Sequence, residues 1–208
     1  PDMDIAISME DGITKDFDFP IFTFAKKKGV NNVLLFPDIV TFSEGDKILR
    51  ESKTFAAKYP WSKKRKQAFF RGATTGRFDL EDIAFSNDRA RAVYFSYLHP
   101  DLVDATFSKI VQFSPDEMKK VGSWLTSLGK SLEGRPVVDH YKYKYLLDID
   151  GNSCTYPRCM WVLSSNSVLL KVMTDHEQWY YGALEPGYHY IPIRSEEHTS
   201  ELQSPCNL

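Results

Sequence analysis

Two glycine-containing turns of this sequence have the composition of a site for a phosphate-bearing ligand. The first reads Arg-Gly-Ala-Thr-Thr-Gly-Arg over residues 71–77 and follows the apolar run 68–70. Its backbone N–H groups, threonine hydroxyls and arginines suit a diphosphate. Its candidate binding residues are Arg71, Gly72, Ala73, Thr74, Thr75 and Arg77. A single Gly-x-x-x-Gly turn is a weak signal without further support.

The second turn lies between two strand-like runs, at residues 143–149 and 167–172. Thr155 can cap a short helix that has Pro157 in its first turn. The order strand, turn, helix, strand predicts a parallel βαβ unit, in which a ligand binds beyond the carboxyl ends of the strands. The candidate residues here are Asn152, Ser153, Cys154, Thr155 and Arg158. A buried βαβ unit with a surface arginine would produce the same spacing.

Aspartates at predicted strand ends supply candidate acid–base or metal chemistry: Asp11, Asp38, Asp148 and Asp150. Asp148 and Asp150 form an Asp-x-Asp pair that could bind a divalent cation. Asp11 could act as a base toward a hydroxyl group, or it could simply shape the Asp-Gly turn in which it lies. The residues by themselves leave these alternatives open.

The remaining pattern predicts an α/β protein in two parts. Residues 1–60 are expected to end one domain, and residues 61–193 to form a second, with the basic run 61–66 as a solvated boundary. Residues 26–29 are interpreted as a loop, and Trp179 and Tyr180 as part of a helix. The other expected strands are 2–8, 20–25, 32–36 and 102–107, and the expected helices are 46–58, 88–98 and 114–129.

Composition narrows the class of protein. The 208 residues are 42% apolar and 26% charged, as in a typical globular domain. A net charge of −2 gives no general attraction to nucleic acid, and no apolar run approaches the roughly 20 residues of a membrane span. Three cysteines do not make a disulfide framework, which favours a reducing compartment.

The order of several motifs resembles glycosyltransferase family 90, which includes protein O-glucosyltransferases and capsule and lipopolysaccharide glycosyltransferases. The motifs are HYKYKYLLDIDGNS at 140–153, SSNSVLLK at 164–171 and QWYYGALEPGYHYIPI at 178–193. The resemblance implies a GT-B-like fold of two Rossmann-like domains facing a cleft. It further implies a UDP-sugar donor, with glucose or xylose expected, and no metal or other cofactor. The implied acceptor is a hydroxyl group on a protein, a cell-surface glycan or lipopolysaccharide.

The same resemblance assigns roles to residues. The opening segment fits the family pattern PDMxxxIxxxD, which implies that Asp11 is the general base of an inverting reaction. The two turns would form the nucleotide-sugar pocket. The segment Thr155-Tyr-Pro-Arg158 carries one residue more than the Ser-x-Arg of the O-glucosyltransferases. Two alternatives are a non-catalytic sugar- or partner-binding member of the family, and a metal-dependent sugar or nucleotidyl transferase that uses Asp148 and Asp150.

Residues 194–208 resemble the in-frame translation of a sequencing-library adapter. We therefore expect this segment to be extraneous, the chain to be cut at both ends, and the fragment alone to be inactive. The compartment would be the cytoplasm for a bacterial protein and the endoplasmic reticulum lumen for a eukaryotic O-glucosyltransferase.

Overall fold

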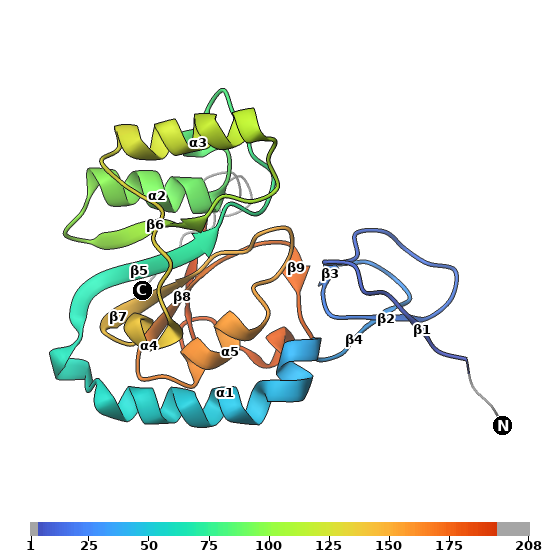
Figure 1. The fold of residues 1–208 in the computed structure, drawn as a ribbon. Helices are drawn as coiled ribbons and strands as arrows, with labels where there is room; N and C mark the ends of the chain where they lie inside the picture. The colour runs from blue at the N-terminus through green and yellow to red at the C-terminus, as the bar shows by residue number, and fades with distance from the viewer. Residues whose placement is uncertain (1–3, 195–208) are drawn as a thin grey trace, which may run out of the picture.

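The computed structural model describes residues 4–194 and has a five-stranded parallel sheet as its centre (Figure 1). The segment 194–208, which was expected to be extraneous, therefore lies outside the described residues, apart from Arg194. The strand order is β10-β8-β7-β5-β6. The bounds are β5 Arg65–Ala73, β6 Val103–Lys109, β7 Tyr143–Asp148, β8 Val168–Val172 and β10 Ile191–Ile193. The predicted α/β class is confirmed, and so is the βαβ unit, because β7 and β8 are parallel neighbours.

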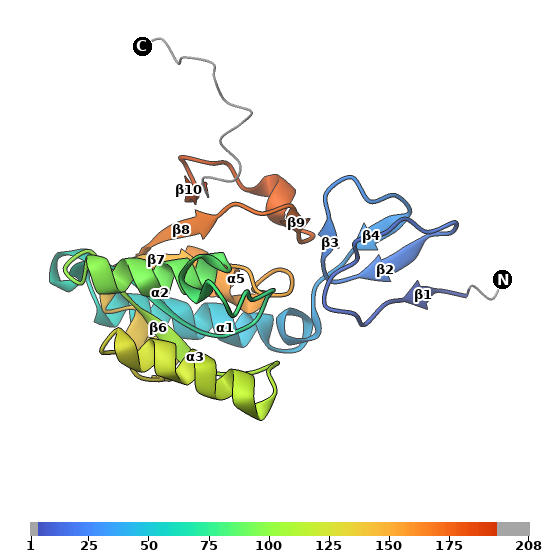
Figure 2. The same ribbon diagram turned by 90° about the horizontal axis from the view of Figure 1, so that it is seen from above.

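Helices cover both faces of this sheet, which explains why its strands are apolar without alternation. On one face, Phe69, Leu146 and Leu169 pack in a cluster with α1 and α5. On the other face, Phe70 and Leu147 are buried toward α2, and α3 packs beyond it (Figures 1 and 2). The helices are α1 Ile39–Lys58, α2 Asp88–Leu98, α3 Pro115–Ser127, α4 Val137–His140 and α5 Pro157–Leu163, with short 3-10 turns at Trp61–Lys63, Ile83–Phe85 and Tyr181–Ala183.

Helix starts follow the capping signals in the sequence. Ser114 and Glu117 form the predicted capping box at the start of α3, and α2 has the predicted bounds. By contrast, α1 begins at Ile39 and not at residue 46, because the buried Asp38 accepts hydrogen bonds from the first N–H groups of α1. Asp38 is thus a structural cap.

A smaller lobe stands beside the carboxyl end of the main sheet (Figure 2). It contains the parallel strands β1 Ala6–Ile7, β2 Ile21–Thr23 and β4 Val33–Leu35, in the order β1-β2-β4. Residues expected to be a loop form β3 (Lys26–Lys27), which pairs antiparallel with β9 (His176–Glu177). The pair β3–β9 joins the two lobes, and the predicted helix around Trp179 is replaced by β9 and a 3-10 turn.

Helix α1, which precedes the predicted boundary at residue 60, packs on the main sheet. Helix α1 lies on α5, and its Ile48 and Phe55 pack against the core of the main sheet. Part of the basic run 61–66 is also structural, because the buried Lys64 donates hydrogen bonds to the Tyr141 carbonyl and Ser167 Oγ. Among residues 4–194, no helix is both long enough and apolar enough to cross a bilayer.

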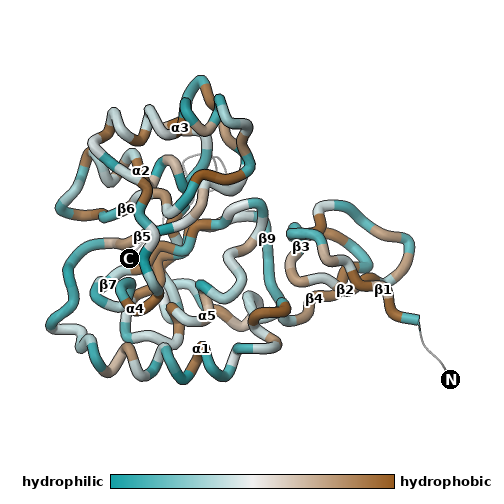
Figure 3. The backbone as a smooth tube through the Cα atoms, viewed as in Figure 1, coloured by the Kyte–Doolittle hydropathy of each residue, from teal (hydrophilic) through white to brown (hydrophobic). Residues whose placement is uncertain are grey.

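Figure 3 shows apolar residues on the strands of both lobes and at the start of α1. In the small lobe, Ile7, Phe22 and Leu34 occupy neighbouring positions on the three strands. Ile7 and Leu34 remain about half exposed, at 54% and 48%. This sheet is therefore much less covered than the main sheet.

Candidate active site

The two predicted turns lie side by side at the carboxyl edge of the main sheet. Their strands, β5 and β7, are parallel neighbours, so both turns leave the sheet at the same edge. Gly76 N–H donates to Asn152 Oδ1 at 3.0 Å. A Cβ atom at Gly151 would lie 2.1 Å from Thr75 Oγ1, so only glycine allows this approach. The two turns therefore form one continuous surface.

Arg89, which the sequence analysis did not identify, holds these two turns together. Its side chain projects from the first turn of α2 and is 9% exposed. The guanidinium makes five hydrogen bonds, which are directed to the carbonyls of Ala73, Ile149 and Asp150 and to Thr75 Oγ1. Burial, reinforced by the nearby Arg158, lowers the pKa of Arg89 to about 10. Arg89 thus places a positive charge directly beneath the turns.

A cleft of about 470 Å³ opens at this edge, between the two lobes. Arg77 is exposed there, and Lys27 of the small lobe lies 3.6 Å from Asp175. Arg91 also lines the cleft and forms an ion pair with Asp88 at 3.2 Å. The lining residues are Thr14, Lys27, Thr75, Gly76, Arg77, Ser86, Asn87, Asp88, Arg91, Asp150, Gly151, Met173, Thr174, Asp175 and His176. The cleft is therefore lined by positive side chains from both lobes, together with the carboxylates of Asp88, Asp150 and Asp175.

Asp11 extends from the small lobe to the second turn. Its Oδ1 accepts hydrogen bonds from Ser153 Oγ and Tyr156 OH, both at 2.7 Å. Its Oδ2 accepts one from Asn152 Nδ2 at 3.2 Å. Gly12 permits this approach, because a Cβ atom there would lie 2.7 Å from Ser153 Cβ. The carboxylate is solvent-exposed and meets the predicted binding turn, although Asp11 is not among the residues that line the cleft.

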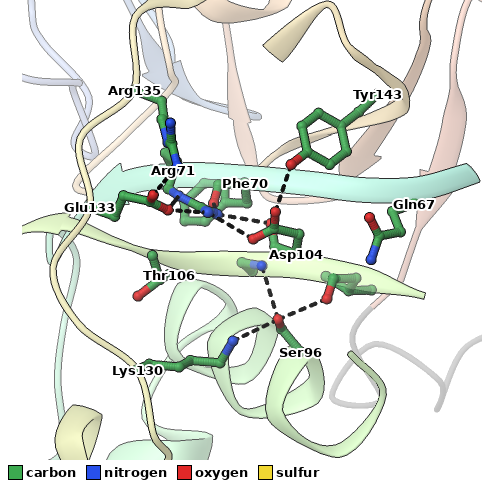
Figure 4. Close-up of polar contacts among 12 residues, drawn as sticks. Gln67, Phe70, Arg71, Ser96, Asp104, Thr106, Lys130, Glu133, Arg135 and Tyr143 are labelled. Atoms are coloured by element: carbon green, nitrogen blue, oxygen red, sulfur yellow. Dashed lines mark hydrogen bonds and ion pairs between the residues drawn. The ribbon is translucent and has the colours of Figure 1, made fainter. Parts of the chain in front are cut away.

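The structure does not bring Arg71 to this surface. Its buried guanidinium is bound by Asp104 and Glu133, which tie the segment after α3 to the sheet (Figure 4). Burial opposes ionisation of Asp104, but hydrogen bonds from Tyr143 and Arg71 outweigh it and hold the pKa of Asp104 below its usual value. Because side chains alternate along β5, Arg71 lies on the same face of the sheet as Phe69, and its guanidinium is 4.4 Å from the centre of the Phe69 ring.

Several other predicted residues support the turns from behind. Arg158 donates to the Arg71 carbonyl at 2.6 Å and lies over the Phe70 ring. The buried Thr74 is bonded to the backbone of Val111. Gly72 packs on the ring of Phe70, and the Ala73 carbonyl accepts from Arg89. The described contacts of these residues therefore stabilise the fold. The residues of the two turns that line the cleft are Thr75, Gly76, Arg77 and Gly151.

The hydroxyl of Thr155 is not a helix cap as predicted. It donates to the buried carboxylate of Asp148, and Tyr156 occupies the capping position of α5 without a side-chain cap. Cys154 is buried, and its burial raises the pKa of its thiol. Cys154 is thus an apolar packing residue beneath the turn.

The Asp-x-Asp pair binds a lysine. Lys171 Nζ lies 2.9 Å from Asp148 Oδ2 and 3.8 Å from Asp150 Oδ1, and all three side chains are buried. Asp150 Oδ2 also accepts a hydrogen bond from Thr174 Oγ1 at 2.6 Å. Burial raises the pKa of Asp150 to about 6, despite the opposing effect of Lys171. An ammonium group therefore occupies the place that a cation would take in the metal-dependent alternative.

Comparison with known proteins finds relatives that are named as O-glucosyltransferases. The rat and human proteins named Protein O-glucosyltransferase 1 are each 27% identical over an alignment of 216 positions, which covers 94% of this chain and 50% of theirs. The O-glucosyltransferase rumi of Drosophila melanogaster is 25% identical over 98% of this chain and 49% of its own. The chain therefore spans about half the length of the curated relatives it matches.

The family described as Glycosyl transferase family 90 matches residues 1–207. This match runs past residue 193, where the adapter resemblance placed the end of the domain. The chain belongs to glycosyl transferase family 90.

Proposed function

We propose that the polypeptide containing this chain is an inverting glycosyltransferase that transfers a sugar from a UDP-sugar to a hydroxyl group of a protein. The relatives named as protein O-glucosyltransferases favour a protein acceptor over lipopolysaccharide and a glucosyl donor over a xylosyl one. The two lobes would correspond to the two domains of a GT-B-like enzyme. The main sheet would bind the donor, and the small lobe would supply the base.

The observation that carries this proposal is the position of Asp11. Its carboxylate comes from one lobe and contacts the turn at the carboxyl edge of the other, where ligands of parallel α/β sheets bind. A structural aspartate that only shapes its own turn has no need for three donors from another lobe. This geometry suits a group that acts on a substrate held between the lobes.

The donor diphosphate would lie at the Thr75–Arg77 end of the cleft. The exposed Arg77 and the buried charge of Arg89 beneath the turns would provide positive potential there. Lys27 would approach from the small lobe. These groups would stabilise the charge that develops on the leaving diphosphate.

The reaction would be a single displacement. The acceptor hydroxyl transfers its proton to Asp11, and its oxygen attacks the anomeric carbon from the face opposite the diphosphate. The bond between the anomeric carbon and the diphosphate oxygen breaks, and its electron pair leaves with UDP. Oδ1 of Asp11 already accepts two hydrogen bonds and Oδ2 only one, so Oδ2 is the atom that takes the proton.

The test is the variant Asp11→Asn in the full-length polypeptide, assayed for transfer from radiolabelled UDP-glucose or UDP-xylose to protein acceptors and to lipopolysaccharide. Turnover should fall by about 10²–10⁴-fold, with donor affinity unchanged. The exposed neighbour Glu10 provides the matched control, since Glu10→Gln should retain activity. NMR should show that the transferred sugar has the anomeric configuration opposite to that of the donor. Excess chelator should leave the turnover unchanged.

Turnover that survives Asp11→Asn would refute the role of Asp11. Retention of anomeric configuration would refute the single displacement. Loss of activity in chelator, restored by Mn²⁺ or Mg²⁺, would favour the metal-dependent alternative.

A further inference from the structure

Tyr156 has a backbone conformation that is unusual for its residue type. It has φ 47° and ψ −109°, close to the first central position of a type II′ turn, where glycine is preferred. A non-glycine residue held there is strained, because its Cβ atom crowds the backbone. The conformation is fixed on both sides, by the hydrogen bond from Thr155 to Asp148 and by Pro157 at the start of α5. Strain of this kind persists where the surrounding structure enforces it.

This conformation directs the Tyr156 side chain away from its own helix and toward the small lobe. Its ring makes an edge contact with Phe24, at 6.5 Å between centroids. Its hydroxyl donates to Asp11 Oδ1 at 2.7 Å and lies 3.2 Å from Ser153 Oγ. Burial raises the pKa of Tyr156, so its hydroxyl keeps the proton that it donates at neutral pH.

We infer that Tyr156 is a positioning residue that holds the carboxylate of Asp11 in the orientation that receives the acceptor proton. The inference rests on the proposed function of Asp11. Tyr156 and Ser153 together bind Oδ1 and thereby fix the rotation of the carboxyl group. Oδ2, which accepts only the longer bond from Asn152, is left directed to the acceptor.

The test is a double-mutant cycle of Tyr156→Phe and Asp11→Asn in the full-length polypeptide. Phenylalanine keeps the ring contact with Phe24 and removes only the hydroxyl. Tyr156→Phe should lower kcat by about 10- to 100-fold, as expected for the loss of one hydrogen bond to a charged group, with KM for the UDP-sugar unchanged. In the Asp11→Asn background the same change should alter kcat less than twofold, because there is no base left to position.

The matched control is Tyr188→Phe, since Tyr188 is 79% exposed and distant in sequence from the turn. An equal loss of kcat in both backgrounds would show that Tyr156 acts only on stability and would overturn the inference. An unchanged kcat in Tyr156→Phe would do the same. Failure of Asp11→Asn to lower turnover would instead refute the proposed function, and the inference with it.

Discussion

Replacement of Arg89 should destabilise the protein even when the positive charge is kept. The planar guanidinium bridges the carbonyls of Ala73, on β5, and of Ile149 and Asp150, beyond β7. The ammonium of lysine is a single point with three donors and cannot reach carbonyls on two strands in the same way. We therefore expect Arg89→Lys to be no milder than Arg89→Met.

The magnitude follows from two opposing effects. Three buried carbonyl groups lose their donor, at about 1–3 kcal/mol each. Against this, burying the charge is unfavourable: the lowering of the pKa of Arg89 from 12.5 to about 10 corresponds to a cost of roughly 3 kcal/mol. Arg89→Met removes this cost together with the charge, whereas Arg89→Lys keeps both. With about 2 kcal/mol for each carbonyl, Arg89→Met should lose about 3 kcal/mol in the free energy of unfolding, and Arg89→Lys, which keeps the buried charge, should lose at least as much.

Urea unfolding followed by circular dichroism would measure this loss. With a slope of about 2 kcal/mol per molar urea, the midpoint should fall by about 1–2 M. Arg50 on α1 is exposed, so Arg50→Met should stay within about 0.5 kcal/mol of the wild type. The reasoning is wrong if Arg89→Lys has wild-type stability, because the stability would then not depend on the planar guanidinium that bridges these carbonyls.

Two buried lysines, Lys171 and Lys64, give two further predictions about stability. Lys171→Met leaves the buried Asp148 without its partner and should cost about 3–5 kcal/mol in urea unfolding, and adding Asp148→Asn should restore part of this; additive losses would contradict the pairing. Burial lowers the pKa of Lys64 from 10.5 to about 8, so the unfolded chain binds more protons between these pH values and stability should rise there with pH. The rise should be roughly 1 kcal/mol after allowance for solvent screening and should be absent from Lys64→Met; an identical pH dependence in both proteins would refute it.

Local sequence determined most of the elements and the location of the turns. The Ser114 capping box and the apolar spacing after Asn87 define α3 and α2, because helix starts depend on residues within one turn. The runs 143–149 and 167–172 are apolar enough to predict the adjacent strands of a βαβ unit. Gly76 and Gly151 likewise mark the turns after two predicted strands, because glycine is a turn-forming residue.

Only the tertiary structure decided which side chains of those turns face the cleft. Arg71 and Arg77 look alike in the sequence, yet Asp104 and Glu133, remote in sequence, bind the first and leave the second exposed. Arg89 occupies an ordinary helical position, and only the packing of α2 on the sheet brings it beneath both turns. These contacts join residues 14 to 62 positions apart. No local pattern encodes them, because they form only once the sheet has brought its strands together.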